Sequence, residues 1–124
     1  MNIQDTIANF KANVAKYEEQ RASFNNVLLG QGYIVGIVCG GNNVLTYNVK
    51  FESVGNGMKK VKDFLLEDPI NCVRFDKETA AKVAACVKNG NGTVGEAIHI
   101  TKALEMRIAS FKESIAFLEE AQAA

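Results

Sequence analysis

Residues 33–51, YIVGIVCGGNNVLTYNVKF, contain two apolar segments joined by a short polar one. The first segment, Tyr33 to Val38, is almost continuously apolar, and glycines and asparagines follow it at positions 40–43. In the second segment apolar residues occupy every other position, at Leu45, Tyr47, Val49 and Phe51. Such alternation turns one side of a strand toward a core, and glycine and asparagine adopt the backbone angles of a tight turn. The stretch therefore predicts a β-hairpin whose second strand is half exposed.

A long helix is predicted on each side of this hairpin, because apolar residues step by four and three near both ends of the chain. The first series is Ile3, Ile7, Phe10, Val14, Tyr17 and Phe24, interrupted at Arg21. The second series is Leu104, Ile108, Phe111, Ile115 and Leu118. A narrow apolar stripe needs a partner, so the helices pack on each other, on the sheet, or on a second copy of the chain. Packing within the chain and homo-oligomerisation are about equally expected.

Residues 55–75 connect the hairpin to a further helix. The segment GNGMKKVKDFLLED, residues 55–68, predicts a turn and a short basic helix. That helix is expected to end before Pro69, since the residue before a proline disfavours the helical region. The following INCVRF, residues 70–75, suggests a third strand.

Asp76 is predicted to cap a helix over residues 77–88, which Asn89 and Gly90 would end. TVGEAIHI, residues 93–100, suggests a last short strand, and Thr101 a cap for the C-terminal helix. The predicted fold is α+β in a single domain, residues 1–124: a small antiparallel sheet packed with long N- and C-terminal helices, in a chain expected to be oligomeric.

Composition limits the partners of the chain. Its 124 residues include 14 Lys plus Arg and 14 Asp plus Glu, so no excess of positive charge favours a long nucleic acid or a membrane surface. No apolar stretch approaches the ~20 residues of a membrane helix. Cys39, Cys72 and Cys86 are an odd number in apolar segments, which indicates buried free thiols and a cytoplasmic protein.

Catalytic and metal-binding patterns are weak. The single histidine, His99, and three separated cysteines do not make a zinc site. If residues 98–100 form a strand, the His99 ring faces away from Ile98 and Ile100, in a structural or surface role. No enzyme, cofactor or metal site is predicted.

The segment NGNGTVG, residues 89–95, holds three glycines and two asparagines. It lacks the lysine and Ser/Thr of a phosphate-binding loop, so it either turns the chain or contacts a ligand. Free amides and carboxamides suit a nucleobase edge or ribose hydroxyls. Asn89, Asn91, Gly92 and Thr93 are therefore candidate ligand contacts.

Arg107 and Phe75 complete the candidate site. Arg107 lies one position before a stripe residue of the C-terminal helix, so its guanidinium can fork onto a phosphate. The alternative is an ion pair with a glutamate such as Glu105 or Glu78. Phe75 ends the predicted third strand and can stack on a base. Lysines near the loops, including Lys102, are expected to be solvated.

Two segments, RFDKETAAKVAACVKNGNG (residues 74–92) and KALEMRIASFKESIAFLEE (residues 102–120), resemble the viral Thoeris anti-defence sponges of the first type, as does the order of elements. Members of that family are small phage proteins that assemble from homodimers. They sequester cyclic ADP-ribose isomers made by bacterial immune enzymes without degrading them, and some also bind cyclic nucleotides at a separate site. The resemblance covers about the last half of the chain.

The resemblance implies a pocket at a subunit interface that encloses a pyrophosphate and two riboses. It places Phe75 on a base, Asn89 and Asn91 in the contacting loop, and Arg107 on the pyrophosphate. The expected function is sequestration of a cyclic ADP-ribose isomer in the host cytoplasm by a homodimer or higher even-numbered oligomer. The alternative is an interaction module that inhibits a host complex through its helix faces; a phosphate-handling enzyme is weaker still.

Overall fold

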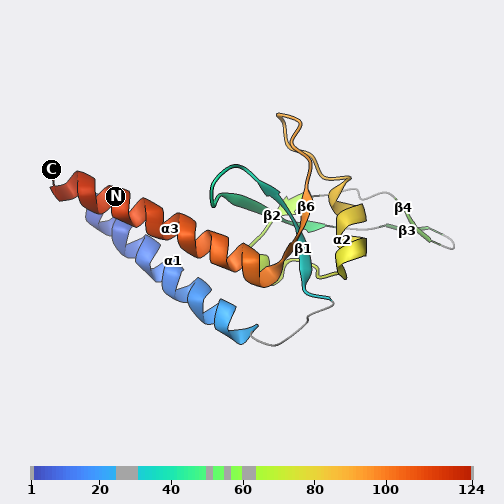
Figure 1. Cartoon of the computed structure of the whole chain (residues 1–124), viewed down its shortest axis with the longest axis horizontal. Helices are drawn as coiled ribbons and strands as arrows, with labels where there is room; N and C mark the ends of the chain where they lie inside the picture. The colour runs from blue at the N-terminus through green and yellow to red at the C-terminus, as the bar shows by residue number, and fades with distance from the viewer. Residues whose placement is uncertain (1, 25–30, 50–51, 55–56, 60–63, 124) are drawn as a thin grey trace.

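The structure, a computed structural model, describes residues 2–24, 31–49, 52–54, 57–59 and 64–123. Its helices are α1 (Ile3–Ser23), α2 (Lys77–Ala84) and α3 (Ile100–Ala123), with a 3-10 turn, η1 (Pro69–Asn71). The strands are β1 (Tyr33–Val38), β2 (Val44–Val49), β3 (Glu52–Val54), β4 (Gly57–Lys59), β5 (Phe64–Leu66) and β6 (Glu96–His99). This confirms the predicted α+β class, and Figure 1 shows the α1–α3 pair extending well beyond the sheet.

The predicted hairpin forms the centre of a four-stranded antiparallel sheet, in the order β5-β2-β1-β6. β1 and β2 pair with Val35 opposite Tyr47 and Ile37 opposite Leu45. In their turn Gly40 has a φ of 106°, which residues with a Cβ rarely adopt, so glycine lets the chain reverse there. β5 and β6 are the two edge strands of this sheet.

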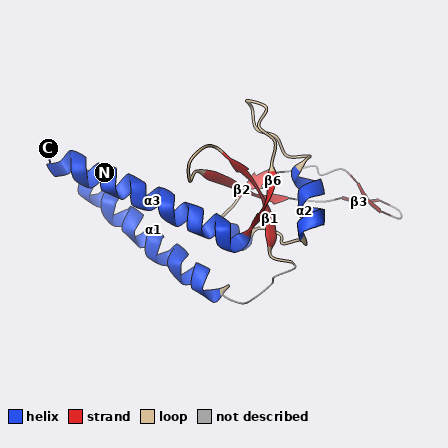
Figure 2. Ribbon diagram, viewed as in Figure 1, coloured by secondary structure: helices blue, strands red, loops and turns tan. Residues whose placement is uncertain are grey.

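Helices cover both faces of the sheet (Figure 2). Val35 and Ile37 pack with Val83 of α2 on one face, while Ile34 packs with Leu104 of α3 on the other. Thr46, on the expected polar side of β2, is completely buried because that side lies under α3. The prediction of a half-exposed second strand therefore differs from the structure on this point.

α1 and α3 form an antiparallel two-helix arm, and their apolar stripes face each other. Ile7, Val14 and Ile115 are buried between the helices, and the rings of Phe10 and Phe111 lie 5.2 Å apart. Arg21, which interrupts the first stripe, donates from Nε to Glu105 at 2.8 Å. The apolar stripes of the two terminal helices therefore pack on each other within the chain, which is one of the predicted alternatives.

Of the two predicted helix caps, Asp76 matches the structure and Thr101 does not. Asn2 accepts from the Asp5 N–H at 2.8 Å, and Asp76 accepts from the Thr79 N–H at 2.8 Å, so both cap their helices. α3 begins at Ile100, one residue before the predicted cap Thr101. The Thr101 N–H donates instead to His99 Nδ1 at 3.3 Å.

The basic helix and the third strand predicted within residues 55–75 are wrong, whereas the predicted turn falls on residues 55–56, which lie outside the described ranges. Gly57–Lys59 is strand β4 and Phe64–Leu66 is strand β5, rather than parts of a basic helix; residues 60–63 lie outside the described ranges. β5 gains the ladder hydrogen bonds of the β2 edge, which outweigh a local helical preference. The expected third strand is the η1 turn followed by one bridge, from Phe75 to Tyr33.

Two further predictions need correction. α2 ends at Ala84 rather than near Asn89, because the chain then turns so that Val87 can pack under the sheet. Only Cys72 is buried, whereas Cys39 and Cys86 are exposed. None of the helices in the described residues has the length and apolar character needed to cross a bilayer.

Candidate functional site

A groove of about 550 Å³ runs along β6, the last strand of the sheet. Its walls come from the start of β1, the β1–β2 turn, the start of α2 and the first turns of α3. The polar and aromatic residues that line it are Tyr33, Asn42, Lys77, Glu96, His99 and Lys102. The fold thus brings side chains from four separate parts of the sequence to one edge.

Tyr33 and His99 form an aromatic pair in this groove. They are opposite each other in the β1–β6 register, and their rings meet edge to face at 5.2 Å and 88°. Tyr33 is held by two backbone hydrogen bonds to Phe75, of 3.0 and 2.8 Å. His99 Nδ1 lies 2.8 Å from Thr101 Oγ1 and 3.3 Å from the Thr101 backbone nitrogen, so Thr101 fixes the orientation of the ring. The pair is a fixed aromatic surface with a polar edge.

Two lysines give the groove a positive charge. Lys77 is the first residue of α2 and Lys102 lies in the first turn of α3, and both are exposed. Glu96 is the one acidic residue in the lining. Within the described part of the chain, no ion pair engages any of these three residues, so their charges remain available to a ligand. Two cations against one carboxylate favour an anion.

Arg107 lies outside this groove, in a polar network between the arm and the sheet. Its Nη2 donates to Thr46 Oγ1 at 2.9 Å, and its Nη1 donates to the Tyr17 hydroxyl at 3.2 Å and lies 3.5 Å from Asp68 Oδ1. Tyr17 donates to the same Asp68 oxygen at 2.8 Å. The expected partners of Arg107, Glu105 or Glu78, are therefore replaced by Asp68.

The network shifts two pKa values. Partial burial would raise the pKa of Asp68, but the hydrogen bond from Tyr17 and the charges of Lys16 and Arg107 outweigh it, so that pKa lies below its ordinary value. Burial raises the pKa of the Cys72 thiol to about 11. Arg107 Nε is buried and has no hydrogen-bond partner among the described residues. A hollow of about 270 Å³ beside Arg107 is also lined by Asn42, Asn43 and Ser110.

The loop of residues 89–93 uses its polar groups on itself. Asn89 Oδ1 accepts from the backbone N–H groups of Asn91 and Thr93, at 3.1 and 3.0 Å. Asn91 Oδ1 accepts from the Thr93 hydroxyl at 2.7 Å, and Gly92 has a φ of 91°. These bonds form a turn that closes the Lys88–Val94 bridge. The loop projects beyond the strands of the sheet, at the top of Figure 1.

The predicted site residues therefore lie in three places. Asn89, Asn91, Gly92 and Thr93 share the projecting turn, while Arg107 contacts α1, β2 and the residue before η1. Phe75 packs half-buried on the α2 side of the sheet, and its backbone holds Tyr33. No described hydrogen bond or ion pair joins the turn to Arg107. Of the predicted site residues, Phe75 is the one connected to the groove, because its backbone is hydrogen-bonded to that of Tyr33.

The residues of the groove carry no local sequence signature that marks them as a site. The sequence predicts a structural or surface role for His99, a solvated side chain for Lys102 and the start of a strand at Tyr33. Their juxtaposition depends on the β1–β6 pairing, which joins residues 33 and 99 across more than half of the chain. The signal in the sequence was the histidine between Ile98 and Ile100, whose ring had to face away from theirs.

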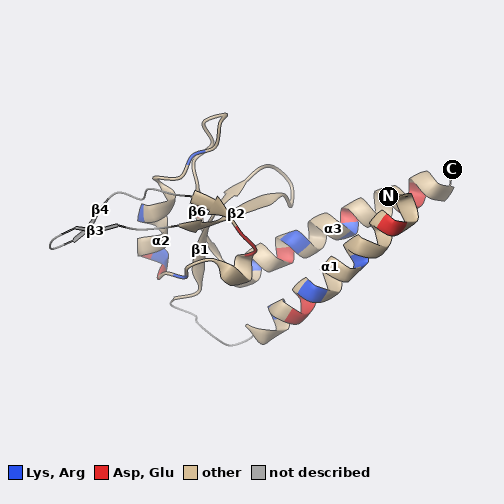
Figure 3. Ribbon diagram, turned by 180° about the vertical axis from the view of Figure 1, so that it is seen from behind, with Lys and Arg blue, Asp and Glu red and all other residues tan. Residues whose placement is uncertain are grey.

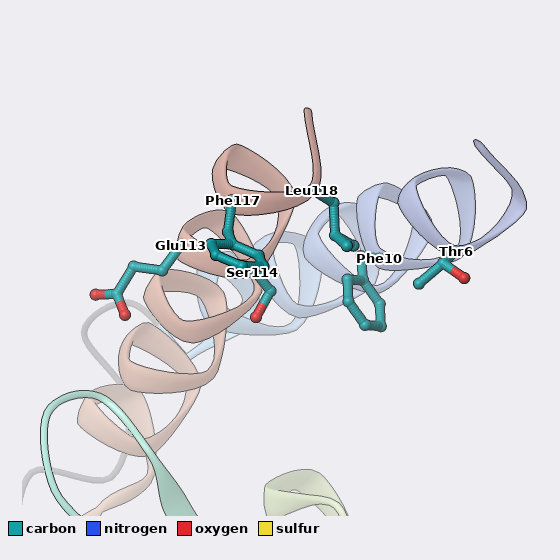
Figure 4. A pocket seen from close by; sticks show the side chains of 6 residues that line it. All are labelled: Thr6, Phe10, Glu113, Ser114, Phe117 and Leu118. Atoms are coloured by element: carbon teal, nitrogen blue, oxygen red, sulfur yellow. The ribbon is translucent and has the colours of Figure 1, made fainter. Parts of the chain in front are cut away.

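A second hollow, of about 410 Å³, lies between the helices near the end of the arm (Figure 4). Phe10 and Thr6 of α1 and Glu113, Ser114, Phe117 and Leu118 of α3 line it. Phe117, at 70%, is the most exposed of the large apolar side chains in the described residues. The hollow is mostly apolar, in contrast to the groove along β6.

Charge is otherwise distributed without a dominant patch. Figure 3 shows basic and acidic residues interspersed along α1 and α3. Among the described residues, no three His, Cys, Asp or Glu side chains come together to hold a metal ion. No protein-family model, curated protein or solved structure matches the chain.

Proposed function

We propose that the protein binds a small anionic nucleotide of the cyclic ADP-ribose class in the groove along β6 and holds it without converting it. The observation that carries the proposal is the pairing of a fixed aromatic surface, Tyr33 and His99, with two lysines that have no partner among the described residues. Bases stack on aromatic rings, and ammonium groups bind phosphate. A nucleotide offers both chemistries within one molecule.

The dimensions of the groove support this assignment. Its volume of about 550 Å³ lies within the range of small-molecule sites, roughly 300–1,000 Å³. Lys77 and Lys102 would bind the phosphates from the two helix starts. Asn42 Nδ2 already donates to Glu113 at 2.7 Å, so the Asn42 carbonyl oxygen and the Glu96 carboxylate would accept from ribose hydroxyls or from the amino group of a base.

Sequestration requires binding of the ligand but no catalytic groups. The protein needs only to bind the signal tightly and in stoichiometric amounts, so that its free concentration falls. We place this activity in the cytoplasm of a host cell, where a phage protein would meet an immune signal, and we expect an even-numbered homo-oligomer. The resemblance of residues 74–92 and 102–120 to the anti-defence sponges supports both expectations.

Isothermal titration with cyclic ADP-ribose isomers tests the proposal, with linear ADP-ribose as a comparison. In the double variant Lys77→Gln, Lys102→Gln, loss of two partly solvated charged contacts of about 1 kcal/mol each should weaken binding roughly 30-fold. Lys82→Gln is the matched control, because Lys82 is an exposed lysine of α2 paired with Glu78 and outside the groove. Its affinity should equal that of the wild type.

Heat release and mass analysis of the bound ligand separate sequestration from turnover. An unchanged cyclic nucleotide supports sequestration, whereas a linear product would make the protein an enzyme. If the wild type binds none of the isomers, the proposal that the groove along β6 binds a nucleotide of this class is refuted.

The second candidate is a module that binds another protein through its helix faces. The exposed ring of Phe117 beside the hollow in the arm favours it. This candidate predicts no nucleotide binding and capture of a host complex whose activity falls in the presence of the protein. Loss of that inhibition in Phe117→Ala would be its specific signature.

A further inference from the structure

β6 is an edge strand of the sheet, and its open side belongs to the groove. All four of its residues line the groove: Glu96, Ala97, Ile98 and His99. Successive side chains of a strand point to opposite faces of a sheet, so a groove that touches all four runs along the edge and not over one face. The backbone N–H and C=O groups of an edge have no partner strand. The main chain of β6 is therefore a further source of ligand contacts, besides the side chains.

The register with β1 decides which backbone groups of β6 face outward. In an antiparallel ladder every second residue exchanges hydrogen bonds with the neighbouring strand, and the residues between them direct their N–H and C=O groups away from it. The Ile100 N–H donates to the Gly32 carbonyl at 2.8 Å, at a position that continues the β1–β6 register by one residue pair. Residues 98 and 96 are therefore in the phase that bonds to β1, whereas Ala97 and His99 direct their backbone groups away from it.

Two residues of this outer edge are open. Gly95 shares their phase, but its N–H already donates to the Val87 carbonyl at 2.8 Å, and α3 begins at Ile100. Between these limits, no hydrogen bond within the described part of the chain engages the Ala97 N–H, the Ala97 C=O or the His99 N–H. The groove thus presents a donor, an acceptor and a donor in succession, and such groups take their partners from water or from a ligand.

We propose that these three groups recognise the edge of a nucleobase, so that Ala97 and His99 determine base specificity through their main chain. The inference rests on the nucleotide proposed above as the occupant of the groove, and it identifies the part of that nucleotide that β6 contacts. The Ala97 carbonyl requires a donor from the base, and the N–H on either side of it requires an adjacent acceptor. Adenine has this pattern, because its amino group stands beside a ring nitrogen that accepts.

The short length of the open edge favours a base over an extended peptide. A peptide that adds a strand to a sheet bonds along a row of residues. Here Val87 occupies one end of the row and α3 closes the other, which leaves three groups for pairing. A base presents only a few donors and acceptors along one edge, so its size matches what is open.

Side chains around this edge suit the rest of a nucleotide. The His99 ring belongs to a residue whose N–H is open, and it lies 5.2 Å from the Tyr33 ring, so the pair can cover one face of a base. Lys102 follows three residues later, in the first turn of α3, and its exposed ammonium group can bind a phosphate. One short segment, residues 97–102, therefore combines contacts to the base and to the phosphate.

Two titrations of the wild-type protein test this inference, with the amino group of the base as the variable. The first uses an isomer of cyclic ADP-ribose, and the second uses the analogue of that isomer in which hydrogen replaces the adenine amino group. Loss of the amino donor leaves the Ala97 carbonyl without a partner in the complex, so the analogue should bind about 10- to 100-fold more weakly.

Amide hydrogen exchange of the full chain reads the main chain directly. In the saturated complex with the amino compound, the N–H of Ala97, of His99 or of both should exchange about 10-fold or more slowly than in the free protein. Ile98 is the internal control, because its N–H is in the phase that bonds to β1 and should be protected with and without the compound.

The outcomes separate this inference from the proposed function. Equal affinity for the two compounds would overturn base recognition by β6, and so would unchanged exchange at both amides in the saturated complex. In either case the wild type still binds the nucleotide, so the proposed function stands. If the wild type binds neither compound, the nucleotide proposal itself fails, and base recognition by Ala97 and His99 fails with it.

Discussion

Substitution of Arg107 by alanine tests whether this residue supports the fold, as its contacts indicate, or a ligand, as its sequence position predicts. The side chain is 21% exposed and joins α3 to Thr46, Tyr17 and Asp68. The first loss is the charged hydrogen bond to Thr46, which is completely buried. Because the Thr46 hydroxyl still donates to the Glu67 carbonyl, this loss costs about 1.5 kcal/mol.

Two smaller destabilising contributions and one stabilising contribution also enter the change in the free energy of unfolding. The ion pair at 3.5 Å is discounted to about 0.5 kcal/mol, since the Asp68 side chain is 38% exposed. Removing the packed stem of Arg107 costs about 1 kcal/mol. Removing its buried, unpartnered Nε returns about 1 kcal/mol. The expected decrease in the free energy of unfolding is about 2 kcal/mol, or roughly 10 °C in Tm for a chain of this length.

Urea unfolding followed by circular dichroism measures this decrease. Lys112→Ala is the matched control on α3, because its exposed ion pair at 3.9 Å should contribute little. Thr46→Val completes a double-mutant cycle, in which the two changes should be non-additive by about 1 kcal/mol. If the free energy of unfolding of Arg107→Ala lies within about 0.5 kcal/mol of the wild-type value and the variant binds nucleotide more weakly, Arg107 contributes to ligand binding rather than to stability.

Three further predictions concern other parts of the chain. A thiol reagent at pH 8 should label Cys39 and Cys86 rapidly and Cys72 only after unfolding, because Cys72 is buried and its pKa is raised to about 11; equal rates at all three would contradict its burial. The Asp76 carboxylate has a lowered pKa through its hydrogen bonds to Thr79, so the stability it gives is present above its ordinary value near 3.8 and is lost as pH falls through the lower, folded value. Asp76→Ala should therefore remove that acid-dependent part of α2 stability, which amide exchange of Ala80 measures; an unchanged exchange profile would exclude the cap. Gly95→Ala should lower Tm, since a Cβ there would lie 2.9 Å from the Ala84 carbonyl oxygen, whereas Gly90→Ala, with open space around it, should not; equal melting of the two would show that residue 95 can shift.

Much of the fold follows from local patterns. The alternation in residues 44–49 and the apolar run before it specify the hairpin, since a strand turns successive side chains to opposite faces. The four-and-three spacing specifies α1 and α3, and Asp76 specifies the start of α2 through one short hydrogen bond. Each of these signals lies within a few residues of the structure that it predicts.

The candidate site was less predictable. The amide-rich loop of residues 89–93 looked like a surplus of ligand contacts, but its side chains bond to its own backbone. The groove along β6 is lined by residues 33, 77, 99 and 102, and no spacing in the sequence indicates that these residues lie close together. Lys77 and Lys102 are predicted from the sequence to be solvated, because the other residues of the groove lie far from them along the chain.

By itself, then, the sequence determined the central hairpin, the two long helices, the cap of α2 and the near-zero net charge, because hydrophobic period and capping chemistry act between residues close along the chain. Only the tertiary structure decided that residues 64–66 extend the sheet rather than form a helix, that Thr46 is buried, and that Arg107 binds Asp68. Those outcomes depend on contacts between distant segments: an unpaired strand edge gains hydrogen bonds, and a helix laid over the sheet removes polar groups from water and requires partners for them.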